Sequence, residues 1–359
     1  MMLITISLVL SLFQQSLAST AFCQNKDYES GALGDFPSQL YNAAPFHPVQ
    51  LNYALPPAKC PSNDDIDGYF FLSPGSIDTL QEDTSIINAD GTLVGSIPGL
   101  FMGMHKYNGT NHIATWTGTH EPVNNAYGSG YITLLDDTYS MVANFTTVNL
   151  GVGADIHEVE ITSSSTAIMV AYLPRRTDLQ AYGGPMNGYL ADSIVQEVDI
   201  ATGRLSFSWN ALEHVDPSES YAAFGSTGNG SVEYPWDYFH INSVQKQPDG
   251  NYLISSRHCQ AVYLIDPSGT IIWRMGGKKS DFVFPQGLEF SWQHHARIHN
   301  RSTLSLFNNG ASEWQEDLPF AQGLLLKFDY SNTNKEVSAI NARNPFSPSH
   351  RCSGDPSNS

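Results

Sequence analysis

The chain has 359 residues, of which 35 are acidic and 17 basic, so its formal net charge is −18. Such an excess of negative charge disfavours nucleic acids and anionic membranes as partners. Hydrophobic residues make up 41% of the chain and charged residues 14%, a composition that excludes disorder along most of its length.

The first 18 residues are predicted to be a cleaved secretory signal. An apolar run from Leu3 to Phe13 is too short to span a bilayer and is followed by Ser16-Leu17-Ala18, a small-x-small cleavage pattern. No Lys or Arg precedes the run, so a buried first strand or helix is the alternative. Because the cleavage pattern favours a signal, we expect a secreted, extracellular protein without a membrane anchor. Four glycosylation sequons agree with secretion: Asn108, Asn144, Asn229 and Asn300.

Four cysteines permit three disulfide pairings. Cys23 and Cys60 flank a Pro- and Asn-rich segment, residues 19–60, and a disulfide between them is the favoured pairing. Cys259 falls in an expected strand and is predicted to be a free buried thiol, and Cys352 an unpaired one. Zinc-type Cys/His spacing is missing, so no metal site is expected.

Residues 61–330 show an all-β pattern with an internal repeat. Short runs rich in Val, Ile, Tyr and Thr are separated by Gly, Asn, Asp and Pro turns. Four segments open with a histidine and continue into two strands, and insertions at 174–192 and 213–235 lengthen the middle interval. These histidines are His105, His157, His240 and His294. Repeats of about 40 to 60 residues with four strands each indicate a β-propeller, and a two-sheet sandwich is the alternative. In a propeller the four histidines would converge on the central channel.

The densest cluster of polar and aromatic residues runs from Pro235 to Gly310. It contains PWDYFHINS, NYLISSRH, IIWRMGGKKSDF, SWQHHARIHN and SLFNNG. The order and spacing of these motifs resemble the arylsulfotransferase family, specifically its fungal secreted branch, over most of residues 60–330. The resemblance implies a six-bladed propeller and a channel histidine that is transiently sulfated by an aryl sulfate, with no cofactor.

The resemblance also implies the catalytic residues. The histidine of QH-x-A falls on His294, the expected nucleophile, and the SSR arginine falls on Arg257. The HxN motif falls on His240 and Asn242, and an earlier channel histidine, the proton donor to the leaving phenol, matches His157.

Elementary chemistry suits these residue types. Sulfuryl transfer resembles phosphoryl transfer, in which charge develops on three equatorial oxygens. Arg257 offers a rigid fork of N–H donors for these oxygens, and His240 and Asn242 add directional hydrogen bonds. A neutral imidazole at His294 can attack sulfur and form a covalent intermediate. The pKa of an ordinary imidazole, near 6.5, lets His157 act as acid and then as base.

The residues around these histidines carry further expectations. Asp155 and Glu158 flank His157 and are candidates to orient its ring. Asp237 and Trp236 either support the loop before His240 or contact an aromatic substrate, and with Asn242 they are the candidate substrate-binding residues. Alternation along strands predicts that His258 and His295 face away from the site.

Two other classes of function fit parts of the pattern. One is a noncatalytic secreted propeller that binds a ligand at the channel mouth. The other is a quinoprotein-like dehydrogenase, because the turns before Trp209 and Trp273 are similar to tryptophan-docking repeats, although blade packing also explains them. Phosphate-binding glycine loops are missing, which disfavours a nucleotide-sulfate donor.

Residues 331–359 resemble neither blade strands nor a continuation of the family. We expect this tail to be disordered and the last blade to be incomplete.

Overall fold

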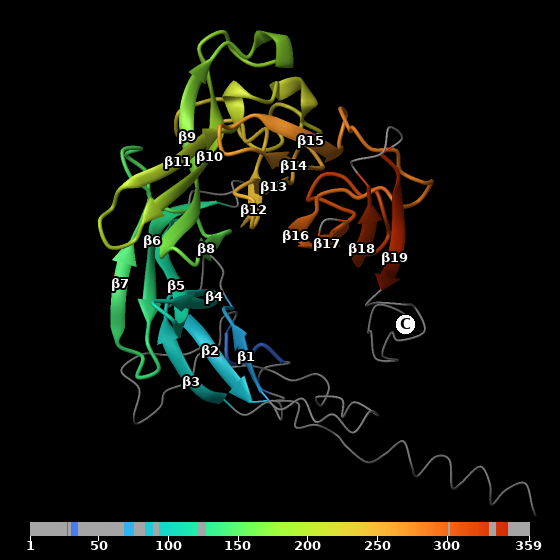
Figure 1. Ribbon diagram of the computed structural model, residues 1–359. Helices are drawn as coiled ribbons and strands as arrows, with labels where there is room; N and C mark the ends of the chain where they lie inside the picture. Colours follow the sequence, from blue (N-terminus) through green and yellow to red (C-terminus); the bar gives the residue numbers. More distant parts are fainter. Residues whose placement is uncertain are drawn as a thin grey trace, which may run out of the picture. The chain divides into compact units, whose positions relative to one another are not determined.

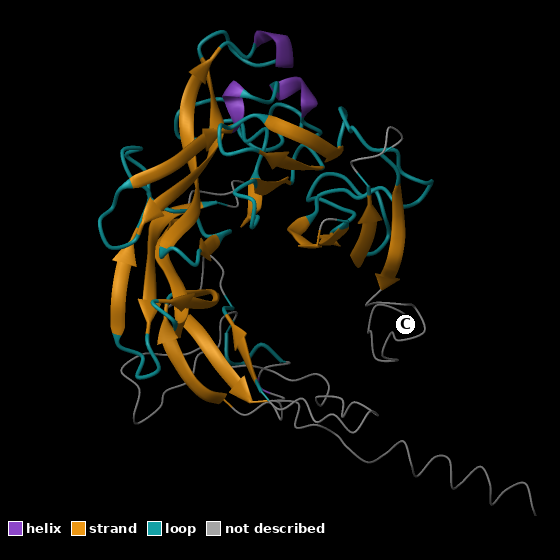
Figure 2. Ribbon diagram, viewed as in Figure 1, coloured by secondary structure: helices purple, strands orange, loops and turns teal. Residues whose placement is uncertain are grey.

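The computed structural model describes residues 27, 30–34, 68–74, 83–88, 93–120, 127–300, 302–329 and 335–343. Within these residues the regular secondary structure is almost entirely β-strand, and the strands form five separate sheets (Figure 2). The chain divides into two compact units, residues 1–101 and 102–359. The predicted all-β fold class is confirmed.

The first unit contains one three-stranded antiparallel sheet. Its strands are β1 (Tyr69–Leu72), β2 (Asp83–Asn88) and β3 (Leu93–Pro98), with β2 in the middle. Ile86 and Ile87 on the central strand are buried, as expected for the strand that has a neighbour on both sides.

Four sheets of four strands follow, each ordered as in the sequence, and Figure 1 shows them in succession from teal to red. The first has β4 (Leu100–Tyr107), β5 (Thr110–His120), β6 (Gly128–Leu135) and β7 (Met141–Phe145). The second has β8 (Val159–Ile161), β9 (Thr166–Thr177), β10 (Gly188–Asp199) and β11 (Leu205–Asn210). The third has β12 (Ile241–Lys246), β13 (Tyr252–Ser256), β14 (Ala261–Ile265) and β15 (Ile271–Gly276). The fourth has β16 (His294–Asn300), β17 (Thr303–Asn308), β18 (Gln322–Phe328) and β19 (Val337–Arg343).

This topology decides between the two expected architectures. Sequential four-stranded meanders are propeller blades, so the two-sheet sandwich is wrong. The resemblance implies six blades, whereas the described residues form five blade-type sheets. The tail prediction is also wrong in part, because β19 pairs with β18 and completes the last blade.

The same type of Asp-stabilised turn connects the last two strands in two of the blades. In the hairpin between β6 and β7, Asp136 Oδ1 accepts hydrogen bonds from the backbone N–H groups of Thr138 and Ser140. Asp266 does the same for Ser268 and Thr270 between β14 and β15. An Asp side chain that replaces backbone partners in this way stabilises a tight turn.

Tryptophans fix neighbouring blades to one another. The buried Trp209 on β11 donates its indole N–H to the carbonyl oxygen of Gly269 in the next blade, over 3.1 Å. Two hydrophobic clusters continue this packing, one shared by β8–β11 and β12–β15 and the other by β12–β15 and β16–β19. The tryptophan pattern therefore reflects blade packing, which removes the main support for the dehydrogenase alternative.

The two predicted insertions are only partly irregular. Residues 174–192 extend the β9–β10 hairpin and carry the short 3-10 helix η1 (Gln180–Tyr182). Residues near 213–235 carry η2 (Ala211–Glu213) and η3 (Pro217–Glu219). None of the helices among the described residues is long and apolar enough to cross a membrane.

Several predictions concern residues that lie outside the described part of the chain: the signal at 1–18, Cys23, Cys60 and Cys352. Cys259 is buried and free, as predicted. All four sequon asparagines are exposed, namely Asn108, Asn144, Asn229 and Asn300.

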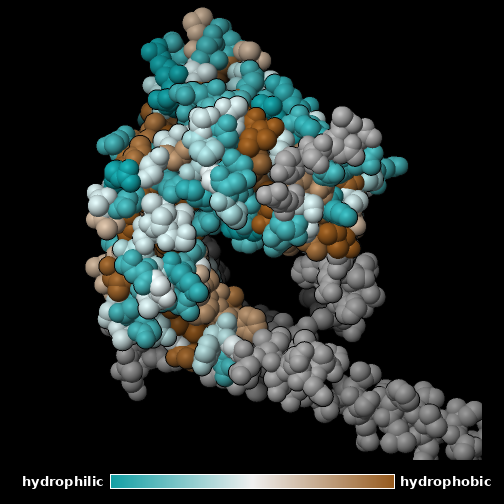
Figure 3. All heavy atoms as spheres, in the orientation of Figure 1, coloured by the Kyte–Doolittle hydropathy of each residue, from teal (hydrophilic) through white to brown (hydrophobic). Residues whose placement is uncertain are grey.

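The face drawn in Figure 3 is mostly hydrophilic over the described residues, with hydrophobic side chains confined to small areas.

Candidate functional site

Three inner strands of successive blades begin next to a catalytic candidate. His157 lies just before β8, His240 just before β12, and His294 is the first residue of β16. The rings of His157 and His240 meet edge to face, with centroids 4.8 Å apart. The charges of His157, Arg257 and His294 all act on His240. The structure therefore brings the four predicted catalytic residues into one cluster.

His105, the fourth histidine of the repeat, is placed differently. It is on β4, and its Nε2 atom contacts the carbonyl oxygen of Met102 at 3.3 Å. Three of the four repeat histidines thus meet, whereas the predicted convergence of all four is not observed among the described contacts.

His294 is held in one tautomer. Its Nδ1 atom lies 2.7 Å from the side-chain oxygen of Asn309, which is an acceptor, so the proton is on Nδ1 and the lone pair is on Nε2. Burial lowers the pKa of His294 to about 4, and the hydrogen bond with Asn309 opposes this shift. At neutral pH the residue is an uncharged imidazole, which is the form that can act as a nucleophile.

The surroundings of His157 shift its pKa in the direction opposite to that of His294. Asp155 Oδ1 lies 2.6 Å from the ring Nδ1 of His157 and also accepts the backbone N–H of His157 at 2.8 Å. Burial disfavours a charge on this ring, but the Asp155 carboxylate outweighs burial, and the pKa of His157 is raised. The expected contact between Asp155 and the His157 ring is present. Glu158 instead pairs with Arg297 at 2.5 Å, so its expected orienting role is wrong.

His240 pairs with the second buried carboxylate. Asp237 Oδ2 lies 2.6 Å from Nδ1 of His240, and both side chains are almost inaccessible. Burial lowers the pKa of His240 well below its usual value and raises that of Asp237 to about 6. His240 has φ = 57°, a left-handed conformation that is rare for a residue with a side chain and that recurs at active sites.

His258 belongs to the cluster, and the prediction that it faces away is wrong. Residues 257–260 form a turn rather than a strand, so alternation does not apply. The buried ring donates from Nδ1 to the carbonyl oxygen of Asp237 at 2.6 Å, and Nε2 accepts from Arg257 Nη1 at 3.1 Å. Burial lowers the pKa of His258 to about 3, which keeps Nε2 available as an acceptor.

Arg257 is constrained on several sides. Besides His258, its guanidinium lies over the rings of Trp292 and Trp314, with centroids 5.6 and 5.9 Å away. Its Nη2 atom is 3.4 Å from both carboxylate oxygens of Glu313. The cation is therefore preorganised at the edge of the histidine cluster.

The predicted substrate-binding residues are buried. Asn242 donates from Nδ2 to the carbonyl oxygen of Gln293 at 2.6 Å, which ties the start of β12 to β16. Trp236 packs in the hydrophobic core and donates to the carbonyl oxygen of Ala222. Asp237 supports His240 and His258. The structure around the site is thus supported by Asn242, Trp236 and Asp237.

Asp237, His240 and His258 also offer one potential metal ligand each, all within 4.8 Å of one another. In the structure the Nδ1 atoms of both histidines make hydrogen bonds to Asp237. These hydrogen bonds account for the arrangement of the group.

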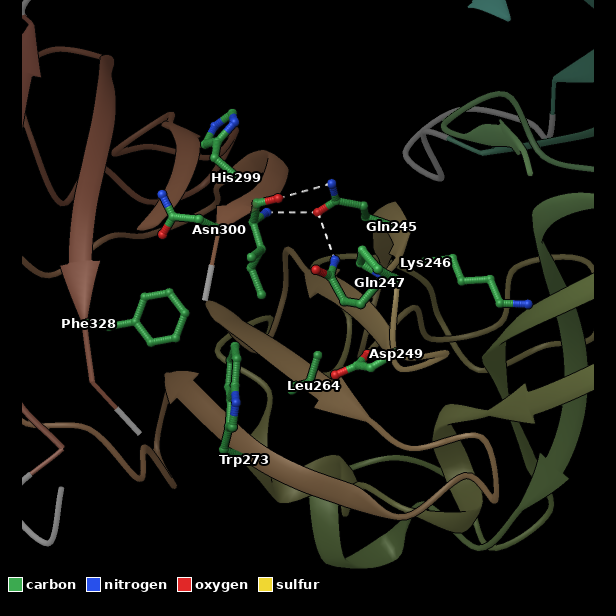
Figure 4. Close-up of a pocket in the computed structure, with 11 residues that line it drawn as sticks. Gln245, Lys246, Gln247, Asp249, Leu264, Trp273, His299, Asn300 and Phe328 are labelled. Carbon is green, nitrogen blue, oxygen red and sulfur yellow. Dashed lines mark hydrogen bonds between the residues drawn. The ribbon is translucent and has the colours of Figure 1, made fainter. Parts of the chain in front are cut away.

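A cavity of about 370 Å³ lies at the other ends of β12 and β16 from His240 and His294. Trp273 and Phe328 line it together with polar residues, and Gln245 bridges to the backbone of Ile298 beside it (Figure 4). Of the predicted site residues only the glycosylation candidate Asn300 lines this cavity, and none of the predicted catalytic or substrate-binding residues does.

A family model described as arylsulfotransferase (ASST) matches residues 103–350. No curated protein matches the chain by sequence. A structure of a protein of unknown function from Bacteroides caccae is similar, with 11% identity, a TM-score of 0.40 and coverage of 78% of this chain and 74% of that one. Hsv2 from Kluyveromyces marxianus has 8% identity, a TM-score of 0.34 and coverage of 79% and 83%.

Proposed function

Because the chain belongs to the arylsulfotransferase family, we propose that it moves a sulfuryl group from an aryl sulfate to a phenolic acceptor through a sulfated His294. The observation that carries this proposal is the contact between His294 and Asn309. It leaves Nε2 of an uncharged imidazole free to attack, next to His157, His240 and Arg257.

The first step transfers the sulfuryl group to the protein. The Nε2 lone pair of His294 attacks sulfur, an N–S bond forms, and the S–O bond to the aryl group breaks. Arg257 donates to the sulfuryl oxygens, where negative charge concentrates. His157, whose pKa is raised, gives its proton to the departing phenolate.

The second step regenerates the protein. His157, now neutral, takes the proton of the acceptor phenol, and the phenolate oxygen attacks sulfur. The N–S bond breaks, and its electron pair returns to Nε2 of His294. Because Nδ1 of His240 faces Asp237 and its lowered pKa leaves the ring uncharged, Nε2 of His240 is an acceptor and does not donate to the sulfuryl oxygens.

Turnover tests this proposal. With an aryl sulfate and an acceptor phenol, the purified protein should release phenol continuously and form a new aryl sulfate. Without an acceptor it should form no new aryl sulfate. His294→Ala should abolish phenol release and formation of the new aryl sulfate, whereas His299→Ala, a change at an exposed histidine on the same strand, should leave them intact. Equal activity of wild type and His294→Ala would refute the proposal.

We also propose that the protein is a secreted glycoprotein of the family's fungal branch. The apolar leader at 1–18 supports secretion, and the exposure of the four sequon asparagines supports glycosylation. Secretion from a eukaryotic host should yield a protein whose mass falls on treatment with an N-glycosidase. A secreted protein of unchanged mass would contradict glycosylation.

A further inference from the structure

The connection between β17 and β18 brings two side chains to Arg257. Glu313 and Trp314 lie inside a small loop closed by a bridge between Ala311 and Glu316. Asp317 fixes this loop because it accepts a hydrogen bond from the indole N–H of Trp292 at 2.7 Å. The loop therefore presents Glu313 and Trp314 from a defined position.

Glu313 contacts one nitrogen of the Arg257 guanidinium. Both of its carboxylate oxygens are 3.4 Å from the same nitrogen, Nη2, and its side chain is 71% exposed. A contact this long, with one partner in water, is weak. A sulfate ester is an anion with several acceptor oxygens, so it competes for the same N–H donors.

Trp314 supplies an aromatic surface beside that position. Its ring meets the buried Trp292 edge to face, with centroids 5.5 Å apart, and lies 5.9 Å from the ring of His258. Its side chain is 37% exposed, whereas Trp292 is inaccessible. An exposed indole next to an arginine suits a ligand that joins an aromatic ring to an anionic group.

We propose that the aryl sulfate donor binds by displacing the Glu313 carboxylate from Arg257 and packing its ring against Trp314. Glu313 is then an internal competitor that weakens donor binding, and Trp314 favours aryl over alkyl sulfates. This inference rests on the proposed function, since it assigns Arg257 to the sulfuryl group.

Binding of a sulfonate that cannot be transferred separates this inference from catalysis. Benzenesulfonate has no leaving phenolate, and its dissociation constant can be measured by calorimetry alongside that of methanesulfonate. Glu313→Gln should bind benzenesulfonate about threefold more tightly, the size expected for an exposed ion pair. Glu316→Gln, which removes an exposed charge from the same loop, should not change the dissociation constant.

Trp314→Ala should weaken benzenesulfonate about fivefold and leave methanesulfonate unchanged, and Trp314→Phe should keep most of the aryl preference. Equal effects of Glu313→Gln and Glu316→Gln, an aryl preference retained in Trp314→Ala, or no binding of benzenesulfonate to the wild type would overturn the inference. Binding as expected in a protein that transfers no sulfuryl group would instead refute the proposed function.

Discussion

The side-chain oxygen of Asn309, just after β17, accepts a hydrogen bond from Nδ1 of His294, at the start of the neighbouring β16. One amide thereby fixes the tautomer and the orientation of the proposed nucleophile. Two strands of the same blade hold the pair, so its geometry depends on the fold rather than on a flexible loop.

Asn309 should therefore act as a positioning residue. Asn309→Ala removes the acceptor, and we expect kcat to fall about 100-fold because the ring is no longer aligned. Asn309→Asp keeps an acceptor but adds a negative charge, which raises the pKa of His294 from about 4. The acid limb of the pH–kcat profile should then move to higher pH. An unchanged acid limb would contradict this role.

Asp155 should control the other end of the pH profile. His157 is protonated to higher pH than an ordinary histidine because the Asp155 carboxylate outweighs burial. Asp155→Asn removes that charge, so the alkaline limb of kcat should shift to lower pH. Thermal unfolding of the variant checks that the fold persists. A shift in the opposite direction would exclude His157 as the proton donor.

The geometry of Arg257 should matter as much as its charge. Arg257→Lys keeps the positive charge but loses the planar fork and its hydrogen bond to His258. We expect kcat/KM to fall about 100-fold, the usual cost of losing a preorganised donor. Arg274→Lys, on the outer strand β15, is the matched control and should have little effect. Full activity of Arg257→Lys would show that a point charge suffices.

A partly buried ion pair should stabilise the fold without taking part in the chemistry. Arg297 on β16 reaches Glu158, whose Oε2 atom also accepts the backbone N–H of Val244 on β12. Arg297→Ala leaves the carboxylate buried and unpaired, and we expect a loss of about 3 kcal/mol in the free energy of unfolding. Adding Glu158→Gln should recover part of this loss in urea titrations. A double variant no more stable than Arg297→Ala would contradict the pairing.

Much of the site was predictable because it follows a repeat. His157, His240 and His294 each stand where an inner strand begins, and this recurrence is visible in the sequence. The β class and the blade topology follow from strand patterns in the same way. Cys259 is buried as predicted, but in the turn at residues 257–260 rather than in the expected strand.

Other features have no periodic signal. Strand alternation predicts the wrong face for His258 because the chain turns at residues 257–260, where Gln260 has a positive φ that alternation cannot reveal. Asn309, Glu313 and Trp314 come from the connection after β17, whose position depends on tertiary contacts such as that of Asp317 with Trp292. The strand β19 is specified mainly by its pairing with β18, so its own sequence gives a weak signal.

The intact mass of the protein after brief exposure to an aryl sulfate without an acceptor tests the sulfated His294 intermediate most directly. We expect one added sulfuryl group that maps to His294, disappears when a phenol is added, and is absent from His294→Ala. A folded wild-type protein that gains no sulfuryl group while still producing a new aryl sulfate would contradict the covalent mechanism, and an adduct on another residue would contradict the assignment of His294.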